Sequence, residues 1–213
     1  MHSNGECVMA TDHIIKSDTV LYLDGEPANV DRVWLLSIRY SGTHYMWKYL
    51  AIMGYQRCVV FWETMAQKHP TTRKQYVHAH LEVGFEYQDC LTTEKCVMPL
   101  RNPIEVFKTH VYRHRWDARQ YEPYILNAFK RFAHVVANHN VFVFRVDAKD
   151  QEAEFYRLGK FLDSDGAYVY QEKNVATSRT RPVSLHQGFT VAQVNAFHNP
   201  PESILELAKQ YGY

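Results

Sequence analysis

The feature that most constrains this chain is an alternation of short apolar runs with longer segments of helical spacing. Five short runs are rich in β-branched or aromatic residues and suit strands: 33–38, 57–62, 76–81, 95–100 and 140–146. Five segments repeat apolar residues with the period of a helix: 43–53, 103–115, 121–138, 150–162 and 201–211. Near-continuous apolar strands separated by helices are typical of a parallel sheet covered on both faces. The sequence therefore predicts an α/β fold, a three-layer sandwich with a central parallel β-sheet flanked by helices.

Length and composition predict one globular domain. The chain has 213 residues, 46% hydrophobic and 22% charged, and no internal repeat or Gly/Ser/Pro-rich linker divides it. We expect a single domain over 1–213, in which residues 1–30 form an accessory lead-in containing a small hairpin turn at "LYLDGEP". The net charge of +1 gives no overall field that would attract nucleic acid or an anionic membrane.

The cysteines and the N-terminus bear on location. The four cysteines form no CxxC pair and no zinc-type set with histidine, so reduced thiols are expected. The first residues lack the pattern of a signal peptide, and no run reaches the ~18 apolar residues of a membrane helix. We therefore expect a cytoplasmic protein without a membrane partner.

A polar break follows the first predicted strand. The segment "SIRYSGTHY", residues 37–45, passes from strand to helix through Gly42. Such a turn presents backbone amides and the positive end of a helix to one point, which suits an anion such as phosphate. The hydroxyls of Ser41 and Thr43 could donate further hydrogen bonds. An ordinary helix N-cap at Ser41 explains the same residues, and the nucleotide-triphosphatase pattern G-x-x-x-x-G-K-[ST] is absent.

Two further segments carry residues suited to phosphate. Arg101 follows the strand 95–100, and Thr109 lies in the helix that Pro103 begins. An arginine fork matches the geometry of a phosphate, although an Arg-Asn-Pro turn is also an ordinary helix start. Arg179 and Arg181 lie in a predicted loop, where a solvated basic turn is the alternative.

Four segments, in the same order, resemble the sulfotransferases that use 3′-phosphoadenosine 5′-phosphosulfate (PAPS), most of all the cytosolic type. "SIRYSGTHY" is similar to their first loop, Tyr-Pro-Lys-Ser-Gly-Thr-Thr-Trp, and "RNPIEVFKT", residues 101–109, to their Arg-Asn-Pro-Lys-Asp-Val-Ala-Val-Ser. "HAHL", residues 78–81, is similar to their Lys-Thr-His-Leu, and "GFTVAQVNAF", residues 188–197, to their Phe-Thr-Val-Ala-Gln segment.

The resemblance implies a P-loop NTPase-like fold of the sulfotransferase type and transfer of a sulfuryl group from PAPS to a small acceptor. It implies His80 as the general base, with Arg39 as the second catalytic residue. The residues implied to bind PAPS, or its product 3′-phosphoadenosine 5′-phosphate (PAP), are Arg39, Tyr40, Ser41, Gly42, Thr43, His44, Tyr45, Arg101, Thr109, Arg179 and Arg181.

The chain departs from the family pattern at its most polar positions. Tyr40 stands where the family has Lys or Arg, so Arg39, His44 or Lys48 would have to supply that cation. His78 replaces the Lys before the catalytic histidine, and Tyr45 stands in place of the Trp that stacks on adenine.

Several alternatives stay open at this point. One is a catalytically degenerate PAP- or PAPS-binding protein of the same fold. Another is a P-loop small-molecule kinase, which would need a loop lysine and carboxylates for Mg²⁺ that this sequence does not offer in suitable places. His78 and His80 share one strand face, an incomplete ligand pair, so no metal is expected. The basic stretch 108–120 fits a solvated helix face better than a nucleic-acid site, and a homodimer stays open.

Overall fold

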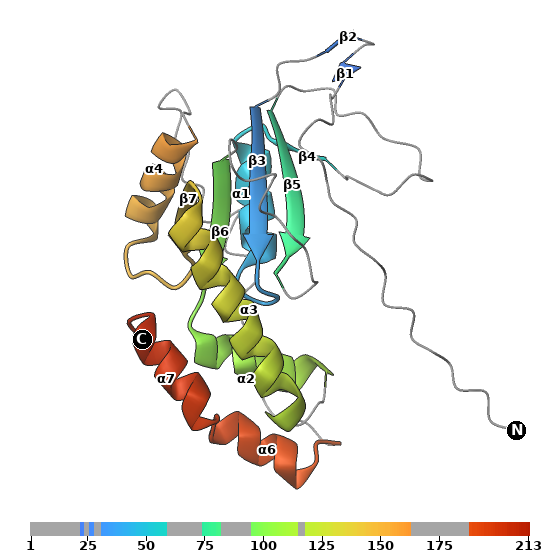
Figure 1. Cartoon of the computed structure of the whole chain (residues 1–213), viewed down its shortest axis with the longest axis vertical. Coiled ribbons are helices and arrows are strands. Elements are labelled where there is room, and N and C mark those ends of the chain that lie inside the picture. Colours follow the sequence, from blue (N-terminus) through green and yellow to red (C-terminus); the bar gives the residue numbers. More distant parts are fainter. Residues whose placement is uncertain are drawn as a thin grey trace, which may run out of the picture.

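A five-stranded, all-parallel sheet forms the centre of the molecule (Figure 1). The computed structural model describes residues 22–23, 26–27, 31–58, 74–81, 95–114, 118–162 and 188–213. Across the sheet the strands follow the order β4 (Gln56–Cys58), β5 (Lys74–His80), β3 (Asp31–Ser37), β6 (Lys95–Leu100) and β7 (Val141–Arg145). Each neighbouring pair is parallel, as predicted.

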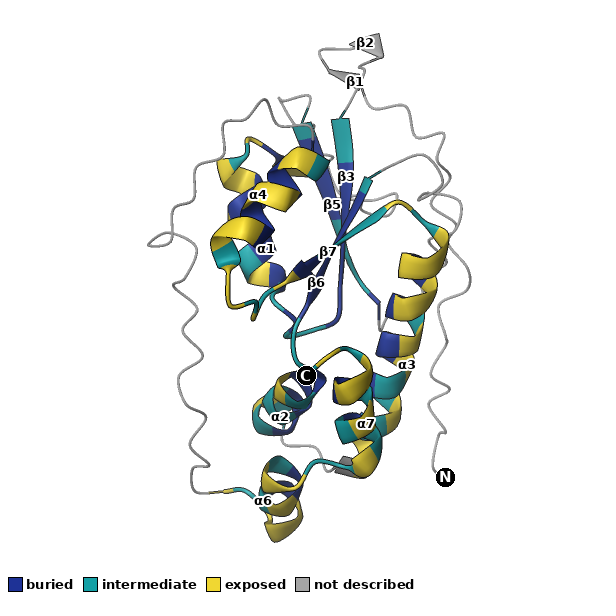
Figure 2. Cartoon of the chain, turned by 90° about the vertical axis from the view of Figure 1, so that its left-hand side faces the viewer, coloured by how far each residue is buried: buried dark blue, intermediate teal, exposed yellow. Residues whose placement is uncertain are grey.

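Helices cover both faces of the sheet (Figure 2). On one face lie α1 (Thr43–Ile52) and α4 (Gln151–Phe161), and on the other lies α3 (Ala118–Asn138). Beyond the carboxyl ends of the strands lie α2 (Pro103–His114), α6 (Val191–His198) and α7 (Glu202–Gln210). This is the predicted α/β architecture, a central parallel sheet between helical layers.

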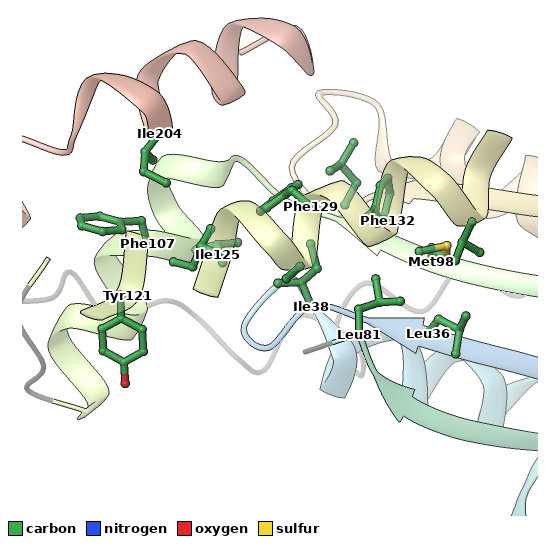
Figure 3. Close-up of a cluster of buried hydrophobic side chains, with 14 of the residues drawn as sticks. Leu36, Ile38, Leu81, Met98, Phe107, Tyr121, Ile125, Phe129, Phe132 and Ile204 are labelled. Carbon is green, nitrogen blue, oxygen red and sulfur yellow. The ribbon is translucent and has the colours of Figure 1, made fainter. Parts of the chain in front are cut away.

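The alternation of side chains along β3 builds a core on each face. Val33 and Leu35 join the cluster that packs α1 and α4, whereas Trp34 and Leu36 join the cluster under α3. Figure 3 shows the second cluster, where Leu36 and Ile38 lie beneath the α3 side chains and Ile204 of α7 joins from the side. Burial of each such aliphatic side chain contributes about 1.5–3 kcal/mol, so the sheet is fixed from both sides.

The predicted elements are found within a few residues of their expected bounds. The hairpin in "LYLDGEP" is confirmed as the antiparallel pair β1 (Tyr22–Leu23) and β2 (Glu26–Pro27). The strand expected at 57–62 begins one residue earlier, and its residues after Cys58 lie outside the described part. Helix α6 was not predicted, although Thr190 and Gln193 form a capping box at its start.

The register of the central strands brings polar side chains together at the carboxyl ends of β3 and β5. In the pairing of β3 with β5, Ser37 lies opposite His80 and Leu35 lies opposite His78. A polar residue at the end of one strand is therefore set beside a histidine at the end of the next.

Candidate functional site

The candidate site lies at the carboxyl ends of β3, β5 and β6. Strands β4 and β5 lie on one side of β3 in the sheet, and β6 and β7 lie on the other side. The strand order therefore reverses at β3. In open parallel sheets, ligands bind where the strand order reverses in this way. The turn after Ser37, the histidines of β5 and Arg101 after β6 all lie at this edge.

The turn between β3 and α1 contains two residues with positive φ. Tyr40 has φ 65°, and Gly42, the N-cap of α1, has φ 112°. A Cβ on Gly42 would lie 2.5 Å from Cγ2 of Val146, so both backbone conformation and close approach require glycine there. The turn brings the first amides of α1 to the edge of the sheet, and such amides lack partners within their own helix.

Ser41 closes the turn from inside and does not cap the helix. Its hydroxyl donates to the Ile38 carbonyl at 2.6 Å, and its amide donates to the same oxygen at 3.1 Å. The alternative of an ordinary N-cap at Ser41 is therefore wrong, because Gly42 occupies the cap position and no side chain bonds there. Ser41 is 1% exposed, and its hydroxyl is already used within the turn.

A hydroxyl–imidazole network lies directly below this turn. The Thr43 hydroxyl donates to the Ser37 hydroxyl at 2.8 Å. The Ser37 Oγ also lies 3.1 Å from Nε2 of His78 and 3.2 Å from Nδ1 of His80. The network joins the start of α1 to the predicted base through a fully buried serine.

Both histidines of this network are held neutral. Burial is the largest cause that lowers the pKa of His78 to about 3, followed by the repulsion that would arise if His78 and His80 were both protonated, and then by Arg57 and His44. Burial and then Arg39 lower the pKa of His80 to about 4, against an opposing hydrogen bond with the Ser37 backbone. Near neutral pH, His80 is therefore an unprotonated imidazole that can accept a proton.

The side chains that lower the pKa values of His78 and His80 are all basic. Arg57 lies over one ring of Trp47 at 4.7 Å, and His44 stacks on Trp47 at 4.6 Å. The edge of Trp47 meets the ring of His78 at 5.1 Å. Basic groups around neutral imidazoles create a positive local field, which favours an anionic ligand.

The side chain of Tyr40 is directed to α2. Its hydroxyl lies 2.8 Å from Nε2 of His114, and its ring meets His110 edge-on at 4.7 Å. Arg39, the preceding residue, lowers the pKa of His80, His110 and His114, which places its charge among these imidazoles.

Arg101 is tied to the same turn. It is 15% exposed, donates from Nη1 to the Tyr40 carbonyl at 3.2 Å and lies 3.9 Å from Glu105. Thr109 donates its hydroxyl to the Glu105 carbonyl at 2.7 Å, within its own helix. Arg101 thus joins the end of β6 to the turn, whereas the hydroxyl of Thr109 bonds within its own helix.

Other predicted site residues lie elsewhere. The ring of Tyr45 packs against Phe144 and Phe155 in the core beneath α4, and its hydroxyl donates to Gln151 at 3.5 Å. Arg179 and Arg181 lie outside the described residues.

Sequence reasoning missed three residues of this site: Ser37, Trp47 and Arg57. Ser37 carried a usable signal, because it is the single polar residue in the run 33–38 and comes last but one. Trp47 and Arg57 carried none, since their contact depends on how α1 packs against β4.

Within the ranges that the structure describes, no group of three or more His, Cys, Asp or Glu could hold a metal ion. Among the helices described, none has the length and apolar character needed to cross a membrane.

Comparison with solved structures finds a distant likeness to a sulfotransferase. The structure is similar to that of the mouse sulfotransferase SULT7A1 complexed with PAP, with 13% identity and a TM-score of 0.48. The match covers 87% of this chain and 90% of the mouse protein. No protein-family model matches the chain, and none of the curated proteins does. A likeness this distant says nothing of activity.

Proposed function

We propose that this chain transfers a sulfuryl group from PAPS to a hydroxyl or amine of a small acceptor, with His80 as the general base. The observation that carries the proposal is the neutral, half-buried imidazole of His80. It lies beside the glycine turn, and the side chains that lower its pKa are basic. Sulfuryl transfer needs a base for the acceptor and positive groups for the donor, and it needs no metal.

The chemistry of the site fits the donor. Bound PAPS would supply an activated sulfuryl group on a phosphate leaving group. The amides of Thr43 and His44 and the charge of Arg39 would hold the 5′-phosphosulfate at the start of α1. Arg101 and Thr109, together with Arg179 and Arg181, would hold the 3′-phosphate.

The residues have separate tasks in the reaction. His80 takes the proton of the acceptor as the acceptor oxygen or nitrogen bonds to sulfur and the bond from sulfur to the bridging oxygen breaks. Arg39 stabilises the negative charge that grows on the leaving oxygen. Burial holds His80 unprotonated, so the base is available before the acceptor binds.

We propose a small-molecule acceptor, action in the cytoplasm, and no membrane or nucleic-acid partner. The acceptor classes to test are phenols, alcohols, amines, sugars and peptides.

The test separates binding from chemistry. Transfer of labelled sulfate from PAPS is measured on an acceptor panel for wild type, for His80→Ala and for the control His134→Ala, an exposed histidine of α3. PAP binding to each protein is measured by calorimetry. Wild type and the control should turn over, and His80→Ala should bind PAP and lose turnover. Equal loss of binding and turnover in His80→Ala would instead make His80 structural.

A second candidate is a PAP-binding protein without transferase chemistry. It is favoured by Tyr40, which stands where the resemblance implies a cation and whose hydroxyl bonds to His114. Tight PAP binding by wild type without turnover of any acceptor would support this candidate over the enzyme.

A further inference from the structure

Three side chains, His44, Trp47 and Arg57, form a basic stack beside the histidines of β5. His44 and Trp47 lie about one turn apart on α1, so they share one face of the helix. The imidazole of His44 stacks on the indole of Trp47 at 4.6 Å, with an interplanar angle of 22°. The guanidinium of Arg57 lies 4.7 Å from the centre of the same indole. One aromatic ring of α1 thus holds two basic side chains in place.

Strand pairing places the basic stack next to the proposed base. Arg57 lies opposite Tyr76 in the pairing of β4 with β5. Because residues two apart on a strand share a face, Arg57 lies on the sheet face that carries His78 and His80. The edge of Trp47 meets the ring of His78 at 5.1 Å, and His78 meets His80 at 4.5 Å. Two ring contacts therefore join the stack to His80.

Arg57 brings to this place a charge that no described carboxylate balances. Its side chain is exposed, and within the described part of the chain its guanidinium forms no ion pair. Contact with an aromatic face leaves the N–H donors in the plane of the guanidinium available. These donors form a planar fork that matches the two oxygens of a carboxylate. Arg57 is therefore suited to bind an anionic group of a ligand.

The order of the strands favours the acceptor over PAPS as the source of this anion. The anion-binding turn follows β3 and Arg101 follows β6, whereas Arg57 lies on β4 at an edge of the sheet. Strand β5, which carries His80, lies between β4 and β3. In-line transfer places the acceptor and the leaving group on opposite sides of the transferred group. An acceptor that reaches His80 from the side away from the turn therefore extends toward β4.

We infer that Arg57 is a specificity-determining residue that binds a carboxylate of the acceptor, so the acceptors are small acids that also carry a hydroxyl or amine. This inference rests on the proposed function, because it names the acceptor class of that reaction. One guanidinium balances one negative charge, which suits a carboxylate. In the reaction the acceptor oxygen or nitrogen bonds to sulfur, its proton goes to His80, and PAP leaves. The carboxylate stays on Arg57 and takes no part in the bond changes.

The direct test compares ligands that differ only in this charge. Binding to the full chain with PAP present is measured by calorimetry at pH 7. The probes are 4-hydroxyphenylacetate and 6-hydroxyhexanoate, each beside its methyl ester. Wild type should bind at least one acid about tenfold more tightly than its ester, which is the effect of a hydrogen-bonded charge pair.

Three variants show whether Arg57 causes the preference. Arg57→Gln should bind acid and ester alike, and Arg57→Lys, which keeps the charge but not the fork, should retain part of the preference. Lys209→Gln removes an exposed cation of α7 and should behave as wild type. Equal binding of acid and ester by wild type in both pairs, or a full acid preference in Arg57→Gln, would overturn the inference.

A kinetic arm separates this inference from the proposed function. With PAPS, the KM of the acid should be about tenfold lower than that of its ester in wild type, and Arg57→Gln should remove the difference. The ratio of acid to ester cancels any effect of Arg57 on the base, since both acceptors give their proton to His80. Sulfate transfer without an acid preference would support the proposed function and overturn the inference. An acid preference that depends on Arg57, without any transfer, would support the carboxylate site and contradict the proposed function.

Discussion

Replacing His110 with phenylalanine should make the protein less sensitive to acid. His110 is 1% exposed, and neither ring nitrogen has a hydrogen-bond partner among the described residues. Its ring meets Tyr40, His114, Tyr121 and Tyr124. Burial, followed by the charges of His114 and Arg39, lowers its pKa from 6.5 to about 3.

The sign and the size of the effect follow from these two pKa values. Between pH 6.5 and about 3 the unfolded chain binds a proton at His110 that the folded chain does not bind, so stability falls as the pH falls. Each pH unit below the unfolded pKa lowers the free energy of unfolding by about 1.4 kcal/mol. Lowering the pH from 7 to 5 therefore removes about 2 kcal/mol of stability at this residue. This value hardly depends on the exact folded pKa, because the folded ring is neutral throughout that range.

The assay is urea unfolding at pH 7 and pH 5. From pH 7 to pH 5, the free energy of unfolding of wild type should fall by about 2 kcal/mol more than that of His110→Phe. The contributions of other titrating groups occur in both proteins and cancel. Val111→Ala is the control, because it removes apolar contacts next to His110 without removing a titrating group. It should lower stability equally at both pH values. An equal loss in wild type and His110→Phe would refute the proposed burial of a neutral His110.

Three further predictions concern the turn and its charges. Gly42→Ala should destabilise the fold by about 1–3 kcal/mol from positive φ and the approach of Val146, seen as a lower urea midpoint. Gly54→Ala is the control for Gly42→Ala and should destabilise the fold less. Its φ is also positive, but the nearest atom to an added Cβ is 4.0 Å away. Arg101→Ala should weaken PAP binding by about 1–3 kcal/mol in calorimetry, and unchanged affinity would contradict its proposed role. Arg39→Gln should raise the pKa of His80 in an NMR titration, because it removes the charged group with the largest lowering effect on that pKa.

The layers of the fold could be predicted because they depend on local patterns. Apolar runs and helical spacing located strands and helices within a few residues, and β3 shows the alternation that a sheet covered on both faces requires. Helix α6 was not predicted, although its capping box of Thr190 and Gln193 is a local signal.

Side-chain partners could not be predicted in the same way. The meeting of Ser37 with His80 depends on the parallel register of two strands that are far apart in sequence. A shift of one residue would turn each side chain to the other face, and nothing in either strand alone fixes that choice. The ring of Tyr45 packs on Phe144 and Phe155, a contact that depends on where α4 lies.

Tyr40 is a neutral residue of the turn that lies beside a positively charged one, Arg39. A non-glycine residue at positive φ costs on the order of 1–3 kcal/mol, so its neighbours must hold it there. Three contacts do so: its hydroxyl bonds to His114, its ring packs on His110, and its carbonyl accepts from Arg101. In the same turn, Arg39 has the largest electrostatic effect of any charged group on the pKa of His80, second only to burial. Because Arg39 acts electrostatically on His80, the neutral side chain of Tyr40 does not by itself argue against chemistry at this site.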